Sequence, residues 1–114
     1  MSIENYTANL NQFFALAAGR GAEVVFLTRP HRDDHVDLRK RDDWRARIPD
    51  YNTALRKVTR STGAGRVDVQ RNFMRNALKH YFSSESETCT AEGVKAMAGL
   101  VIARLEVMGL VAVD

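Results

Sequence analysis

Cysteine and long apolar runs are scarce in this 114-residue chain, and each scarcity excludes a class of protein. The only cysteine is Cys89, so an internal disulfide cannot form, and we expect a reducing compartment: the cytoplasm, or a virion for a phage protein. No apolar stretch approaches the roughly twenty residues that span a bilayer, and residues 1–12 show no leader pattern. We therefore expect neither secretion nor contact with a membrane.

The overall composition is that of a folded protein. Apolar residues make up 45% of the chain and charged residues 27%, which is typical of globular domains and not of disordered tails. The length fits one domain over residues 1–114. Arginine outnumbers lysine, and alanine, valine and glycine are frequent, a bias that suggests a bacterial or phage genome.

Apolar residues at steps of three and four predict a helix in the first segment. They are Ile3, Tyr6, Leu10, Phe13 and Ala17. Ser2 is suited to cap this helix, and Gly19 or Gly21 to end it.

Two helical segments are predicted in the middle of the chain. Trp44 and Ile48 fit one short turn, which we expect Pro49 to end. Asp50 then caps a longer helix that stops at the turn-rich residues 61–65. The apolar positions of this helix are Tyr51, Ala54, Leu55 and Val58.

Two further helices follow, separated by a polar loop at residues 83–88. The first begins near Asp68, and its expected inner face is Phe73, Met74, Ala77, Leu78 and Tyr81. The second has Thr90 as its N-cap and Gly109 just past its end. Its expected inner stripe is Val94, Met97, Ala98, Val101, Ile102, Leu105 and Met108.

Strands are predicted at three places. Residues 22–28 contain a short β-branched run, residues 35–40 alternate apolar and polar side chains, and residues 110–113 are short and apolar. The first two segments would form a hairpin, with the third beside it. The sequence therefore predicts an α+β fold of about four helices with a small antiparallel sheet.

The net charge of +3 conceals a separation of charge along the chain. Residues 51–80 are strongly basic and contain one acid, Asp68, whereas residues 81–114 are acidic. Arg71, Arg75 and Lys79 recur every four residues and would form a cationic ridge on one helix. The candidate residues for binding nucleic acid or another anionic partner are Arg56, Lys57, Arg60, Arg66, Arg71, Arg75 and Lys79. A solvated helix face that only keeps the protein soluble explains the ridge equally well.

Residues 31–37 hold the best metal-ligand types, with His31, Asp33 and His35 as weak candidates. Pro30 and the alternation that follows favour a loop and strand, where two histidines four apart would point away from each other. We therefore predict no metal and no cofactor. The alternative is that these residues form a charged hairpin tip with no bound metal.

Catalytic residues are not predicted, because neither Cys89 nor any serine lies in a recognisable nucleophile motif. Trp44, set among charged residues, is a candidate interface anchor, although it could equally close the edge of the core. Phe82, at the foot of the cationic ridge, could stack on a base or cover the core.

These patterns favour a non-enzymatic binding protein that engages nucleic acid, or nucleic-acid machinery, through the basic residues 56–79. One alternative is a structural or accessory subunit of a phage or mobile-element assembly, which forms a homo-oligomer by pairing its basic and acidic parts. Another is an inhibitor of a host nucleic-acid enzyme, with an acidic protein surface as its partner. An enzyme is the least favoured class.

Overall fold

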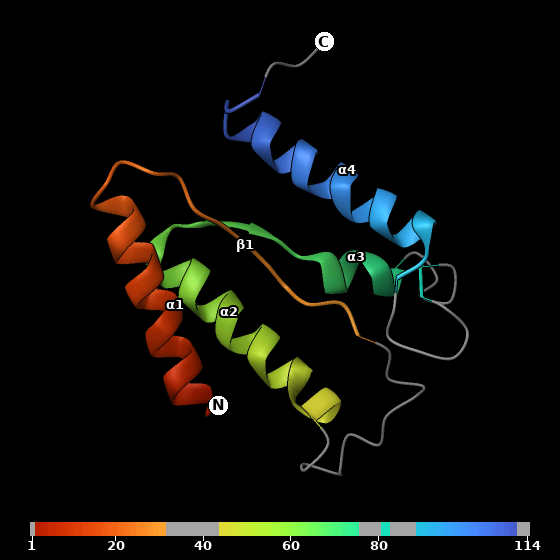
Figure 1. Ribbon diagram of the computed structural model, residues 1–114, viewed down its shortest axis with the longest axis horizontal. Helices are drawn as coiled ribbons and strands as arrows, with labels where there is room; N and C mark the ends of the chain where they lie inside the picture. Colours follow the sequence, from red (N-terminus) through yellow and green to blue (C-terminus); the bar gives the residue numbers. More distant parts are fainter. Residues whose placement is uncertain (1, 32–43, 76–80, 83–88, 112–114) are drawn as a thin grey trace.

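A computed structural model describes residues 2–31, 44–75, 81–82 and 89–111 (Figure 1). Along the chain these form α1 (Ile3–Ala18), β1 (Val25–Leu27), the 3-10 helix η2 (Trp44–Arg47), α2 (Ile48–Thr62), β2 (Gly65–Val67), α3 (Val69–Arg75) and α4 (Ala91–Val107). Helices α1 and α2 pack together on one side of the strands, and α4 packs on β2 from the other (Figure 1). The described chain is mostly helical with a small sheet, which agrees with the predicted α+β class.

The strands of this sheet are parallel, so the predicted antiparallel arrangement is wrong. Val25 pairs with Gly65, Phe26 with Arg66, and Leu27 with Val67. Parallel strands need a long crossover, and η2 and α2 lie in the connection between β1 and β2. Residues 35–40, the expected hairpin partner, lie outside the described residues. Leu110 and Val111 form no strand, and residues 112–113 are also outside the description.

Gly65 explains how β2 can lie so close to both of its neighbours. A Cβ atom at this position would lie 3.1 Å from Met108 Sδ, 3.1 Å from Val25 Cγ2 and 3.2 Å from Val24 O. These approaches are tighter than ordinary van der Waals contact, so a larger residue would push β2 away from β1 or from the end of α4. The residue expected to belong to a loop is therefore the first residue of a strand.

The predicted caps of the first and last helices are confirmed. The Asn5 amide donates to Ser2 Oγ over 3.0 Å, and the Gly93 amide donates to Thr90 Oγ1 over 3.1 Å. Gly109 adopts φ +75°, and beyond it the Leu110 amide donates to Leu105 O over 2.9 Å. This hydrogen bond from residue i+5 back to residue i defines the Schellman motif, which the glycine predicts at the end of the helix.

The predicted start of α2 is wrong, because Pro49 lies in the first turn of the helix and does not end the preceding one. Proline is tolerated there, since the first amides of a helix have no carbonyl partner inside it. Arg47 occupies the N-cap without a side-chain hydrogen bond, and Asp50 lies in the first turn instead of capping. Its charge is still favourable at that end of the helix dipole.

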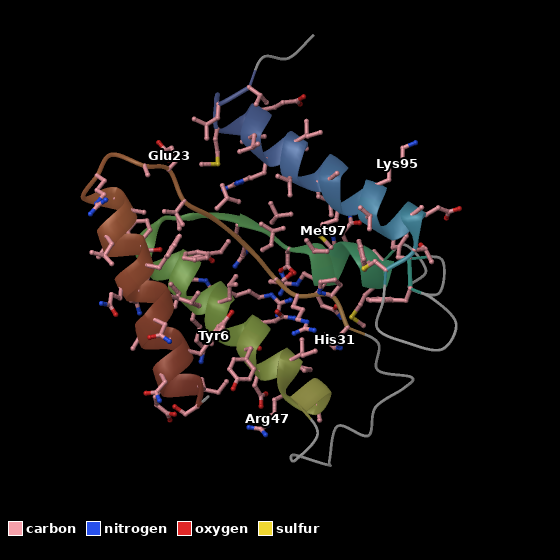
Figure 2. The ribbon with its side chains drawn as sticks, viewed as in Figure 1. Tyr6, Glu23, His31, Arg47, Lys95 and Met97 are labelled. Carbon is pink, nitrogen blue, oxygen red and sulfur yellow. The ribbon has the colours of Figure 1, made fainter. Side chains whose placement is uncertain are left out.

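Buried apolar residues lie on α2, where Ala54, Leu55 and Val58 occupy the predicted apolar positions, and also between the sheet and α4. Val67, Val69, Phe73 and Phe82 form a buried cluster, against which Val25 and several residues of α4 pack. The ring of Phe73 lies 4.6 Å from that of Tyr81 and 5.9 Å from that of Phe82. Met97 is one of the α4 residues on this cluster, as expected (Figure 2).

Other residues expected to face inward do not. Met74 is 53% exposed, Val94 is 58% exposed and Ile102 is 52% exposed, so these parts of the predicted faces are wrong. Phe13 is 58% exposed although its ring lies 6.0 Å from that of Phe26. Helical spacing marks a wide apolar stripe, but the described chain covers only part of it. Ala77 and Leu78 are outside the described residues.

Two glycines of α4 give a matched test of this packing. Gly93 is buried against the Tyr81 backbone, where an added Cβ would clash with Tyr81 O, whereas no atom lies near the Cβ position of Gly99. Gly93→Ala should therefore lower the free energy of unfolding by about 1–3 kcal/mol. Gly99→Ala should raise it by about 0.5–1 kcal/mol, because alanine loses less backbone entropy in a helix. Urea denaturation of both variants measures the difference, and equal shifts would contradict this account of how α4 docks.

Candidate anion-binding site

Asp68, the only acid in the basic region, holds together three parts of the fold. Its carboxylate accepts a two-pronged hydrogen bond from Arg56 of α2, with Nε 2.8 Å from Oδ2 and Nη2 3.0 Å from Oδ1. Oδ1 also accepts from Thr28 Oγ1 at 3.0 Å and from the Arg71 amide at 3.2 Å. The residues that follow β1 and β2 are thereby tied to α2 and to the start of α3.

The pKa of Asp68 reflects two opposed effects. Burial raises it, but the hydrogen bonds from Arg56, the Arg71 amide and Thr28, together with the charge of Arg56, outweigh burial and lower the pKa to about 2. The same hydrogen bond raises the pKa of Arg56. Both groups are therefore ionised at neutral pH, and the charge of Arg56 is neutralised inside the protein.

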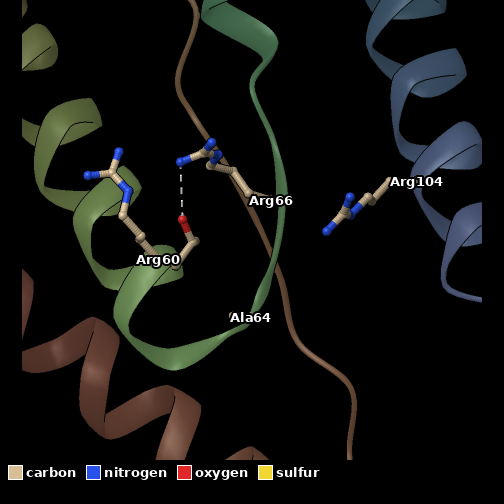
Figure 3. A pocket seen from close by; sticks show the side chains of 5 residues that line it. Arg60, Ala64, Arg66 and Arg104 are labelled. Carbon is tan, nitrogen blue, oxygen red and sulfur yellow. Dashed lines mark hydrogen bonds between the residues drawn. The ribbon is translucent and has the colours of Figure 1, made fainter.

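Three other arginines line one cavity of about 220 Å³ (Figure 3). Arg60 comes from the last turn of α2, Arg66 from the middle of β2, and Arg104 from the last turn of α4. Thr59 and Ala64 complete the lining, and none of the five is an acid. The cavity therefore brings cations from three elements together at the end of the sheet where β2 begins.

Hydrogen bonds hold one of these arginines and leave another with an unused donor. Arg66 Nη1 donates to Thr59 Oγ1 over 3.4 Å and to Arg56 O over 3.5 Å. Arg104 Nε is buried and has no hydrogen-bond partner. A buried donor left without an acceptor costs about 1–3 kcal/mol. Guanidinium groups match the oxygens of phosphate in both charge and geometry.

The structure divides the predicted basic residues between different surfaces. Arg60 and Arg66 meet in the arginine cavity, and Lys57 lines a separate cavity with Ile3 and Thr7. Arg71 and Arg75 are exposed on α3, with Arg71 Nε 3.8 Å from Asp68 Oδ2. Lys79 lies outside the described residues, so the expected ridge is described over Arg71 and Arg75 alone.

Of the other predicted site residues, the two whose side chains are described, Phe82 and His31, are buried. Phe82 is only 2% exposed and packs in the core, so its ring has no free face for a base. The backbone of Trp44 begins η2, but its side chain is outside the described residues. His31 is buried, and its amide donates to Gln70 Oε1; Asp33 and His35 are outside the description.

Arg104 is the site residue that sequence reasoning missed. It lies in residues 81–114, the acidic part of the chain, and not in the basic segment. Its spacing held the missing signal, because it lies three residues after Val101 and four before Met108, both on the predicted inner stripe. An arginine on the inner face of a helix needs an internal role, and lining a cavity provides one.

The Asp68 network gives a prediction for pH dependence. Because the pKa of Asp68 falls from 3.8 to about 2 on folding, the carboxylate stabilises the fold fully above about pH 4 and loses this effect as the pH falls towards 2. Asp68→Asn should lower the free energy of unfolding at pH 7 by roughly 2 kcal/mol and flatten its decline between pH 4 and 2. Denaturant titrations across that range measure both effects, and an unchanged pH profile in the variant would refute the assignment.

Comparison with known proteins gives a fold and no family. No family model and no curated protein matches the chain. One similar solved structure is LAE5, described as an alpha/beta hydrolase enzyme from the metagenome of Lake Arreo, Spain. The TM-score is 0.71 at 23% sequence identity, over 98% of this chain and 50% of that one. At this identity the similarity shows the fold alone, and the chain spans half the length of the hydrolase.

Proposed function

We propose that this is a non-enzymatic binding protein that holds a phosphate group of a nucleic acid in the cavity formed by Arg60, Arg66 and Arg104. The presence of three arginines from different elements in the lining of one cavity that has no acid carries this proposal. Like charges gathered in one place repel each other, so such a cluster is most stable when an anion binds between them. Thr59 adds a hydroxyl beside the guanidinium groups.

A nucleic acid is favoured over a free anion because further cations lie along the same part of the chain. β2 begins at the arginine cavity and leads directly towards α3, which carries the exposed Arg71 and Arg75. A nucleic acid has a phosphate at every nucleotide and can contact several such positions, whereas a single anion occupies one. An acidic protein surface is the alternative partner, and it includes the surface of a nucleic-acid enzyme that the chain inhibits. If oligonucleotides fail to bind, this alternative is favoured.

A second candidate function, a subunit of a larger assembly, rests on a different observation. The described chain exposes large apolar side chains on α1, on α4 and just beyond the end of α4. They are Phe13, Leu16, Val94, Ile102, Val107 and Leu110. Each described strand has one neighbour, although parallel strands usually occur in wider sheets with both faces covered. Surfaces of this kind are typical of contacts with another protein segment.

The similarity to the hydrolase supports this second candidate and not a catalytic activity. Half of the hydrolase chain has no counterpart here, which leaves room for a further protein segment beside the matching half. For this chain we continue to propose a binding role without catalysis, in the cytoplasm or in a virion. Within the described residues, no helix is long and apolar enough to cross a membrane.

The arginine cavity is tested by removing two of its charges. Arg60→Ala with Arg104→Ala should weaken binding of a labelled single-stranded oligonucleotide at least tenfold, measured by fluorescence anisotropy. It should also reduce the slope of log affinity against log salt by about 0.7, because the cavity holds one phosphate and each lost phosphate contact contributes about 0.7. Lys95→Ala combined with Arg20→Ala removes the same charge away from the cavity and is the matched control. Equal losses in the two double variants would reject the cavity as the binding site.

The assembly candidate is tested by light scattering on the purified chain. The wild type should have the mass of an oligomer, and Leu16→Gln with Ile102→Gln should reduce that mass to one chain, because glutamine removes the apolar contact and keeps the size. Lys95→Gln serves as the control on the exposed surface of α4 and should leave the mass unchanged. A wild-type chain that is monomeric at all concentrations would exclude self-assembly and leave a different chain as the partner.

A further inference from the structure

A second cavity, of about 320 Å³, lies at the opposite end of the strands from the arginine cavity. His31 follows β1 and Gln70 follows β2, and both line it together with Arg71 of α3 and residues of α2. In open parallel sheets, ligands bind outside the carboxyl ends of the strands. Two of the predicted basic residues, Arg56 and Arg71, line it, but the cavity itself has no role in the function proposed above.

Gln70 provides the observation that points to a ligand. The residue is only 4% exposed, and its Oε1 accepts the His31 amide at 2.6 Å. This bond fixes the orientation of the side-chain amide, because the oxygen must face His31. Nε2 is then a buried donor, and no group in the structure accepts from it. A ligand oxygen seated against Gln70 would supply the missing acceptor.

The charges around the cavity favour an anion with one negative charge. Arg56 and Arg71 line it, and Asp68, bonded to Arg56, lies next to them, which leaves one net positive charge. Arg71 carries that charge, because its side chain is 60% exposed and its Nε lies 3.8 Å from Asp68 Oδ2, a longer contact than the one Arg56 makes. A dianion would face Asp68 with too little positive charge to balance it.

The remaining walls favour a ligand with an apolar end. Met74 lines the cavity and is 53% exposed, and Pro49 contributes a second apolar surface. A small site that combines a few polar anchors with an apolar wall binds a molecule of the same mixed character. The planar fork of an arginine is matched by the two oxygens of a carboxylate.

We propose that this cavity is a binding site for a small monocarboxylate with a short apolar chain, whose carboxylate is held by Arg71 and the Gln70 amide. The apolar chain lies against Met74. This site is separate from the arginine cavity, because none of its anchoring residues lines that cavity, although Arg71 is also one of the cations proposed to contact a nucleic acid.

The test uses butyrate as the probe and isothermal titration calorimetry as the measurement, with butyramide as a neutral molecule of the same shape. Wild-type protein should bind butyrate saturably and butyramide at least tenfold more weakly. Gln70→Glu keeps the oxygen that accepts from His31 but replaces the donor by a second negative oxygen, so it should abolish butyrate binding. Arg71→Ala should weaken binding at least tenfold.

Two controls separate this site from general effects. Arg75→Ala removes an exposed charge from the same helix, and Arg60→Ala removes one from the arginine cavity; neither should alter butyrate affinity. Circular dichroism and the unfolding midpoint show whether Gln70→Glu is folded, and Arg71→Ala tests the proposal if it is not. Absence of saturable butyrate binding by the wild type, or an equal loss in Arg71→Ala and Arg75→Ala, would overturn the proposal.

Discussion

The two-pronged hydrogen bond between Arg56 and Asp68 fixes the relation between the helices and a very small sheet. Each strand is three residues long, and a two-stranded sheet of this length has little stability of its own. Asp68 follows β2 and accepts from Thr28, which follows β1, while Arg56 reaches it from α2. The crossover helix and both strands are therefore bonded to one carboxylate, which holds the parallel pair in register where the strands end.

The same pairing determines which cations remain available for other roles. Arg56 is neutralised by Asp68, and Arg71 is partly neutralised, so the predicted basic surface is weaker at the carboxyl ends of the strands than the sequence indicates. Arg60, Arg66 and Arg104 surround a cavity without an acid at the other end. The chain thus has a cavity with three arginines at one end of its sheet and a cavity with one net positive charge at the other, and these two environments favour different anions.

Several features that depend on neighbouring residues were predictable from the sequence, although the start of α2 was not, and those that depend on distant residues were not. Ser2, Thr90 and Gly109 form caps within their own turns, so their residue types are sufficient. β2 has no such signal, because Gly65–Val67 is too short to show alternation and becomes a strand only by pairing with β1, about forty residues earlier. Two of the three arginines of the candidate site were predicted, because Arg60 and Arg66 belong to the basic segment, whereas Arg104 joins them only through the packing of α4 on β2.

Some apolar residues that helical spacing assigned to the core are exposed in the structure. Their exposure is explained by the small number of strands in the sheet. Both the strand direction and the stacking of the helices on the sheet lie in the plane of Figure 1, so the sheet can widen only along the short axis of the molecule. The Cα atoms span 41 × 39 × 17 Å, and the 17 Å dimension leaves room for few strands side by side at about 4.8 Å each. A helix such as α4 can cover a wider sheet than β1 and β2 provide. This explains why the apolar side chains of Val94 and Ile102 remain more than half exposed in the described chain.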